Sequence, residues 1–186
     1  MTQSIIQDIS IQLGNALIKN HLRIALAESC TGGLVCQHLT NIPGSSAWFD
    51  RGFISYSNES KIELLKVDQT TLLKFGAVSQ EVASEMALGA LKESHAQIAL
   101  SITGIAGPSG GSTEKPVGTV FFAIAQHNKI IFNASKVFPG SRENIRESSC
   151  LFALNQVLAL TLNPQVFDCK FYILKHKYQS DIGISI

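Results

Sequence analysis

The sequence predicts an α/β protein: a three-layer α/β/α domain with a mixed, mostly parallel sheet and a C-terminal hairpin. Two observations predict this class. Apolar residues switch between helical and strand spacing along the chain, which is typical of the units that build a parallel sheet. Two strand-like runs, 117–125 and 129–138, follow each other across the polar residues 126–128. This spacing indicates a hairpin, and therefore some antiparallel pairing.

Each element follows from its own spacing and end residues. Ile5, Ile9, Leu13 and Leu17 recur at helical intervals, so an amphipathic helix is expected over 4–19. The other strands are expected at short apolar runs, and the other helices after capping residues, with Asn58 and Ser79 as two of the caps. In order, these elements are a strand over 23–27, a helix over 32–40, a strand over 53–56, helices over 58–66 and from 79, a strand over 98–103, the hairpin, and a last helix over 141–162.

Composition indicates one globular domain over 1–163 and a C-terminal extension over 164–186 of unknown structure. Of 186 residues, 45% are hydrophobic and 16% are charged, which is enough for one core. The formal net charge of +1 argues against nucleic-acid binding. No apolar run reaches the ~20 residues that span a bilayer, and the N-terminus lacks the features of a signal peptide. We therefore expect a cytoplasmic protein without membrane association.

The four cysteines are expected to be reduced and structural. Their positions, Cys30, Cys36, Cys150 and Cys169, do not have the spacing of metal ligands. No metal site and no cofactor are therefore predicted.

The segment 27–33 follows the buried apolar run 24–26 and leads into a predicted helix. A strand that ends in a Ser/Thr/Gly turn before a helix directs backbone N–H groups and the helix dipole at one place, which favours anions. The same turn carries Ser29, Cys30 and Thr31, three side chains that become nucleophiles beside a base. The alternative is that these residues only cap the helix.

Polar or glycine-rich residues gather in four segments, three of them at predicted strand ends. Ligands of α/β sheets bind beyond the carboxyl ends of strands, so the first three segments are expected to meet. The segments are 29–33, 56–61, 103–111 together with 115–118, and 140–146.

The chain resembles the CinA C-terminal domain family through seven motifs in the same order. The motifs are Ala-Glu-Ser-Cys-Thr-Gly-Gly at 27–33, Gly-Ser-Ser-Ala-Trp-Phe at 44–49, Tyr-Ser-Asn-Glu-Ser-Lys at 56–61, Gly-Ala-Val-Ser at 76–79, Thr-Gly-Ile-Ala-Gly-Pro at 103–108, Lys-Pro-Val-Gly-Thr-Val at 115–120 and the Gly140/Arg142/Arg146 pattern. The resemblance covers residues of about 5–162, without the family's companion N-terminal domain. Two departures are Ser141, where similar members carry Asp, and the extension beyond 163.

The resemblance implies hydrolysis of the amide of nicotinamide mononucleotide to nicotinate mononucleotide and ammonia. An amide is a poor electrophile, so the site needs a nucleophile, a base and donors for the oxyanion. We predict Ser29 as the nucleophile and the backbone N–H groups of Thr31, Gly32 and Gly33 as donors. Cys30 is a rival nucleophile, but no histidine lies in the four segments to pair with it.

Lys61 is the predicted base. If Asn58 caps its helix, Lys61 lies in the first turn, where the helix dipole and burial both lower the pKa of an amine. In the family motif Tyr56, Asn58 and Lys61 occur together, and Tyr56 would orient or relay the proton. The alternatives are a solvated surface lysine and a half-buried strand tyrosine.

The substrate phosphate is expected near Arg142 and Arg146. They lie four residues apart near the start of the last helix, where two cations are unfavourable unless an anion joins them. The alternative is a solvated charged turn. The other predicted substrate contacts come from the second and third segments, and are Asn58, Thr103, Gly104, Gly107 and Lys115.

The last helix is apolar around most of its circumference over 151–162. We predict a homo-oligomer contact there, with a buried core helix as the alternative.

The sequence leaves three candidate functions for the whole chain. They are an amidohydrolase acting on a nucleotide, a catalytically silent nucleotide-binding module, and an accessory protein of DNA uptake or recombination, against which the charge argues.

Overall fold

A computed structural model gives the structure of the protein and describes residues 2–163. The predicted extension over 164–186 lies outside the described residues. The elements are α1 (Thr2–Lys19), β1 (Ile24–Glu28), α2 (Leu34–Thr40), the short 3₁₀ helix η1 (Ser45–Ala47), β2 (Phe49–Ile54), α3 (Asn58–Leu65), α4 (Gln69–Phe75), α5 (Gln80–Lys92), β3 (Ile98–Gly104), β4 (Thr119–Gln126), β5 (Lys129–Val137) and α6 (Arg142–Leu162).

The strands form one mixed sheet in the order β2-β1-β3-β4-β5. β1 lies between β2 and β3 and is parallel to both, while β4 is antiparallel to its neighbours β3 and β5. The predicted fold class and the hairpin of β4 and β5 are confirmed. The carboxyl ends of β1, β2 and β3 consequently lie at the same edge of the sheet.

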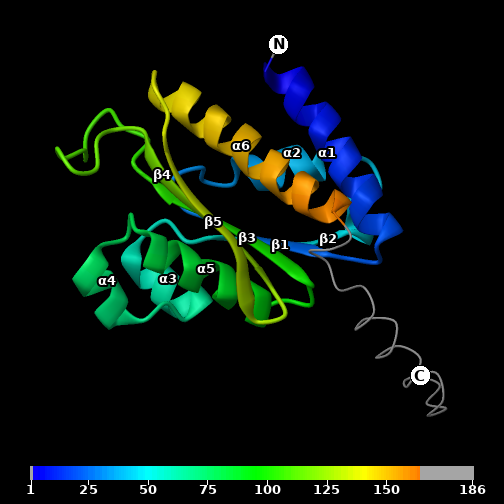
Figure 1. Cartoon of the computed structure of the whole chain (residues 1–186), viewed down its shortest axis with the longest axis horizontal. Coiled ribbons are helices and arrows are strands. Elements are labelled where there is room, and N and C mark those ends of the chain that lie inside the picture. Colours follow the sequence, from blue (N-terminus) through cyan, green and yellow to red (C-terminus); the bar gives the residue numbers. More distant parts are fainter. Residues whose placement is uncertain (1, 164–186) are drawn as a thin grey trace.

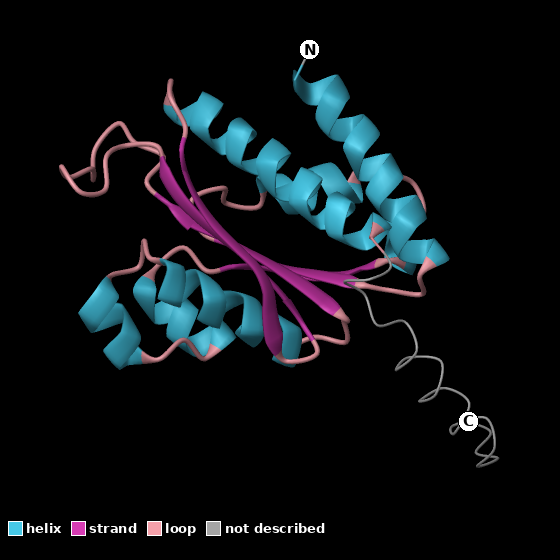
Figure 2. Cartoon of the chain, viewed as in Figure 1, coloured by secondary structure: helices cyan, strands magenta, loops and turns pink. Residues whose placement is uncertain are grey.

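Helices cover both faces of the sheet, as Figures 1 and 2 show: α1, α2 and α6 lie on one side and α3, α4 and α5 on the other. The two faces differ in side-chain size. Ile24, Leu26, Leu100 and Phe122 face α1, α2 and α6. Mainly alanines (Ala25, Ala27, Ala99, Ala123 and Ala125) face α5. Small side chains let α5 approach the sheet closely.

Three local expectations were wrong. β2 begins at Phe49 rather than at 53, because its half-exposed position at the sheet edge tolerates the polar residues Asp50 and Arg51 that hid it in the sequence. The short α4, capped by Asp68, was not anticipated. The cap of α3 is Ser57, whose hydroxyl accepts the Ser60 N–H, and not Asn58.

The apolar circumference of α6 is explained inside the chain. Ala153, Leu154 and Val157 are fully buried and belong to the core that α6 shares with α1, α2 and the sheet. The alternative of a buried core helix is therefore the one that the structure supports. A homo-oligomer stays a prediction, without the argument from this helix.

None of the helices described over residues 2–163 is both long and apolar enough to cross a membrane.

Gly89 lets α5 pack against the end of α3. A Cβ atom at this position would overlap the carbonyl oxygen of Leu65, which is backbone and cannot turn away. We expect Gly89→Ala to lower the free energy of unfolding by about 1–3 kcal/mol, the usual cost of overpacking. Chemical denaturation measures this difference. A gain in stability, which is the ordinary effect of Gly→Ala within a helix, would contradict the contact.

Candidate active site

The four predicted segments meet at the carboxyl edge of β1, β2 and β3. Ser29 follows β1, and its N–H donates to the carbonyl of Ile102 in β3 at 2.9 Å. Ser55 follows β2, and its N–H donates to the carbonyl of Glu28 at 2.8 Å. The backbone ladder thus continues past the last paired residues of the strands and fixes where the two loops begin.

A serine and a lysine are in contact at this edge. Lys61 Nζ lies 3.1 Å from Ser29 Oγ and donates to the carbonyl oxygen of Ser55 at 2.7 Å. Lys61 is 1% exposed and Ser29 is 8% exposed. The solvated surface lysine is therefore excluded, and the amine and the hydroxyl are held together away from bulk water.

Burial lowers the pKa of Lys61 from its usual value to about 8, and nearby Cys30 opposes this only in part. Because Ser57 is the cap, Lys61 lies one residue deeper in α3 than predicted, so burial is the main cause of the shift. An amine with this pKa is neutral in a useful fraction of molecules near neutral pH. Lys61 is thus suited to accept a proton.

Cys30 is a poor rival to Ser29. It is buried, and burial raises the pKa of its thiol to about 12. The thiolate is the reactive form of cysteine, so this environment disfavours a cysteine nucleophile.

The N–H groups of the turn are only partly available. Gly32 N–H donates to the carbonyl of Ser29, and Gly33 N–H donates to the carboxylate of Glu28. Of the three predicted oxyanion donors, these two are thus engaged. Within the described part of the chain, the N–H groups of Thr31 and Cys30 donate to no other residue, and the buried hydroxyl of Thr31 has no hydrogen-bond partner. The free donors of the turn are therefore at Cys30 and Thr31.

Two arginines of α6 reach the other segments. Arg142 donates to the hydroxyl of Tyr56 and to the carbonyl of Gly107, both at 2.8 Å. Arg146 donates to the carbonyl of Thr31 at 2.7 Å. The fourth segment therefore joins the site. Tyr56 is 60% exposed, and in the described structure no hydrogen bond joins it to Lys61.

Most of the remaining predicted residues contact the protein's own backbone. Thr103 donates to the carbonyl of Ala77, and the ammonium of Lys115 donates to the carbonyls of Phe75 and Val78. Gly104 lies against strand β4, where a Cβ atom would come within 2.7 Å of the Thr119 carbonyl. Asn58 is exposed at the first position of α3. Their contacts with a substrate stay predictions.

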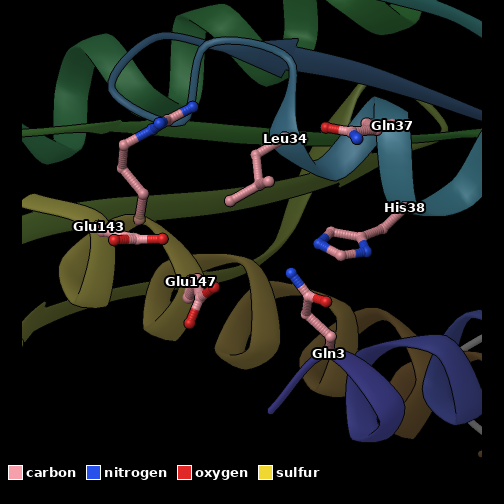
Figure 3. Close-up of a pocket in the computed structure, with 7 residues that line it drawn as sticks. Gln3, Leu34, Gln37, His38, Glu143 and Glu147 are labelled. Carbon is pink, nitrogen blue, oxygen red and sulfur yellow. The ribbon is translucent and has the colours of Figure 1, made fainter.

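A cavity of about 180 Å³ lies beside this edge, between α1, α2 and α6, and Figure 3 shows it. It is lined by Leu34 and by six residues with polar or charged groups, which are Gln3, Gln37, His38, Glu143, Arg146 and Glu147. Ser29 and Lys61 do not line it. Arg146 is the side chain that belongs to both places, since it also contacts the turn through Thr31.

Sequence reasoning missed two residues that build the site. Ser55 supplies the carbonyl that binds Lys61, and the buried carboxylate of Glu28 supplies the acceptors at the start of α2. Glu28 had one signal in the sequence: it is an acidic residue at the end of an apolar strand, directly before a Gly-rich turn.

An α/β/α domain with a buried serine beside a lysine of lowered pKa has the parts of an enzyme that attacks a carbonyl group through a serine. Comparison with known proteins makes this class specific. Residues 6–161 match the model of the CinA C-terminal domain, and the chain belongs to this family.

Named relatives and solved structures agree with this membership. The chain is 48% identical to "Nicotinamide-nucleotide amidohydrolase PncC" of Enterobacter agglomerans, over 85% of this chain and 96% of the relative. It is 49% identical to the protein of the same name from Escherichia coli K12, over 83% and 93%. The crystal structure of the competence/damage inducible protein CihA from Agrobacterium tumefaciens has a TM-score of 0.81 and 41% identity, over 83% of this chain and 94% of that one.

Proposed function

We propose that the protein is a nicotinamide-nucleotide amidohydrolase in which Ser29 is the nucleophile and Lys61 the base. The observation that carries the assignment of residues is the 3.1 Å contact of Lys61 Nζ with Ser29 Oγ in a buried site. The names of relatives nearly 50% identical over most of both chains support the substrate class.

The reaction proceeds in two stages. Neutral Lys61 takes the proton of Ser29 as Oγ attacks the carboxamide carbon, and the ammonium then protonates the leaving nitrogen, which departs as ammonia. Lys61 next takes a proton from water as the water oxygen attacks the acyl-serine ester. Its ammonium then returns a proton to the departing Ser29 Oγ, which restores Ser29, and the product acid ionises to the carboxylate. The N–H groups of Cys30 and Thr31 are the free donors for the oxyanion, and each such donor is typically worth about 3 kcal/mol.

Ammonia release from nicotinamide mononucleotide by the purified protein tests the activity directly. A catalytically silent nucleotide-binding module would bind the nucleotide and release none. Among the described residues, Cys30, Cys36 and Cys150 are all free thiols, which suits a reducing compartment, and we place the reaction in the cytoplasm.

The substrate phosphate is assigned to Arg142 and Arg146. We expect Arg142→Ala to lower kcat/KM for nicotinamide mononucleotide roughly 30-fold. This factor corresponds to about 2 kcal/mol, the contribution of one charge-assisted hydrogen bond. Nicotinamide riboside lacks the phosphate, and its kcat/KM should scarcely change. Steady-state kinetics on both substrates measures the difference.

An equal loss on the two substrates would give Arg142 a structural role instead. Its hydrogen bonds to Tyr56 and Gly107 would then be what the substitution breaks. Tyr56→Phe separates these cases further, because it removes one of the two acceptors and leaves the guanidinium in place.

A further inference from the structure

The carboxylate of Glu28 is buried at the start of α2. It accepts three backbone N–H groups: those of Gly33 at 3.0 Å, Val35 at 3.2 Å and Cys36 at 2.8 Å. Glu28 is 1% exposed, and both ion pairs of the described residues involve Asp50 instead. The backbone N–H groups and the helix dipole therefore stabilise this negative charge without a cationic side chain.

Glu28 replaces the ordinary helix cap. The residue at the cap position is Gly33, which is left-handed with φ +92 and offers no side chain. Serine or threonine of a strand–helix turn usually performs this task. Because Glu28 supplies the acceptors from five residues upstream, the hydroxyl of Ser29 remains free to contact Lys61.

Glu28 is linked to both Ser29 and Lys61. Its side chain accepts hydrogen bonds at the start of α2, where the turn 29–33 ends, and Ser29 is its neighbour in the chain. Its carbonyl accepts the Ser55 N–H, and the Ser55 carbonyl accepts a hydrogen bond from Lys61. A change in the conformation of Glu28 would thus shift Ser29 directly and Lys61 through one intermediate residue.

We propose that Glu28 is a positioning residue that, as an ionised carboxylate, holds the turn of Ser29 against Lys61 for amide hydrolysis. This role rests on the proposed function. The charge is required because a carboxylate only accepts hydrogen bonds, whereas glutamine of the same shape directs an NH₂ donor at one of the three N–H groups. Glu28 also fills the place that an external anion would take at this helix start, so the substrate phosphate binds elsewhere.

The test compares Glu28→Gln with Asp50→Asn. Asp50 is a matched control, because its side chain is 4% exposed, accepts the His95 N–H, and lies at the opposite end of the sheet. We expect Glu28→Gln to lower kcat about 100-fold, the effect of misplacing reacting groups by about 1 Å, with KM within about threefold. Asp50→Asn should lose stability and keep kcat within about threefold.

A second readout does not depend on activity. The pH dependence of Lys61 acylation by acetic anhydride, followed by mass spectrometry, reports the ionisation of its amine. A loosened turn admits water, so the pKa of Lys61 should rise from about 8 toward that of a free lysine in Glu28→Gln. Cys30 is the other titratable side chain that acts on Lys61, and it is unchanged in this variant.

The outcomes separate the two proposals. Normal kcat together with an unchanged labelling profile in Glu28→Gln overturns the positioning role. Absence of ammonia release by the unmodified protein overturns the proposed function, while the shift in labelling still decides the role of Glu28. If Glu28→Gln does not fold, Glu28→Asp keeps the charge and shortens the reach. We expect about a 10-fold loss of kcat and a smaller labelling shift from it, and no change in either overturns the proposal.

Discussion

Ser29→Ala is expected to lower kcat for ammonia release at least ~10³-fold, because it removes the atom that attacks the amide. The fold should stay intact. Ser29 is small, and the hydrogen bond of its backbone N–H to Ile102 does not depend on the hydroxyl. An ammonia assay and thermal unfolding on the same preparation measure the two quantities.

Ser10→Ala is the matched control for this substitution. Ser10 is buried like Ser29, and its hydroxyl donates to the carbonyl of Ile6 within α1, on the helical layer away from Lys61. Its kcat should equal that of the unmodified protein. Near-normal turnover by Ser29→Ala would exclude the serine mechanism and direct attention to water activated by Lys61.

Lys61→Arg should be nearly inactive. Arginine keeps the positive charge but does not deprotonate in proteins, so it cannot take the proton of Ser29. Steady-state kinetics compares the variant with the unmodified protein. An active arginine variant would show that Lys61 contributes only its charge.

The pH profile tests the same base without a substitution. The base must be neutral, so log(kcat/KM) should rise with pH up to an ionisation near the pKa of about 8 and then level off. The position of this ionisation follows from burial, which favours the neutral amine and brings its pKa below the usual value near 10.4. A profile that is flat from pH 6 to 9 would contradict this role.

The pattern of spacing was sufficient for the layers of the fold and for most of its elements. The strands that lie inside the sheet, such as 24–28 and 98–104, are almost entirely buried and mainly apolar, so they were easily found. Strand β2 was misplaced because an edge strand has one free side, so Asp50 and Arg51 interrupt its apolar pattern. The seven residues of α4 are too few to establish a helical period.

The sequence predicted the side chains that the chemistry requires. It did not predict which backbone or side-chain groups those residues hydrogen-bond to. Ser29 and Lys61 were predicted from motifs, and the structure brings them into contact. The engagement of Gly33 N–H and Lys115 was not predictable, because their partners, Glu28 and two carbonyls near 75–78, are set by tertiary packing. The cap of α3 was wrong by one residue, since Ser57 and Asn58 are both good capping residues.

Ser29 and Lys61 follow two adjacent parallel strands. Ser29 comes directly after β1, and Lys61 lies on α3, the helix that follows β2. β1 and β2 stay in register up to Glu28 and Ile54, after a single irregularity between Ile24 and Ala25 at the far end. A slip of one residue in this pairing would move β2 by about 3.3 Å and turn its side chains to the opposite face. This displacement is larger than the 3.1 Å distance between Lys61 Nζ and Ser29 Oγ, so the two atoms would no longer be in contact. An added or lost residue in the exposed edge strand would therefore abolish proton transfer without altering any residue of the site.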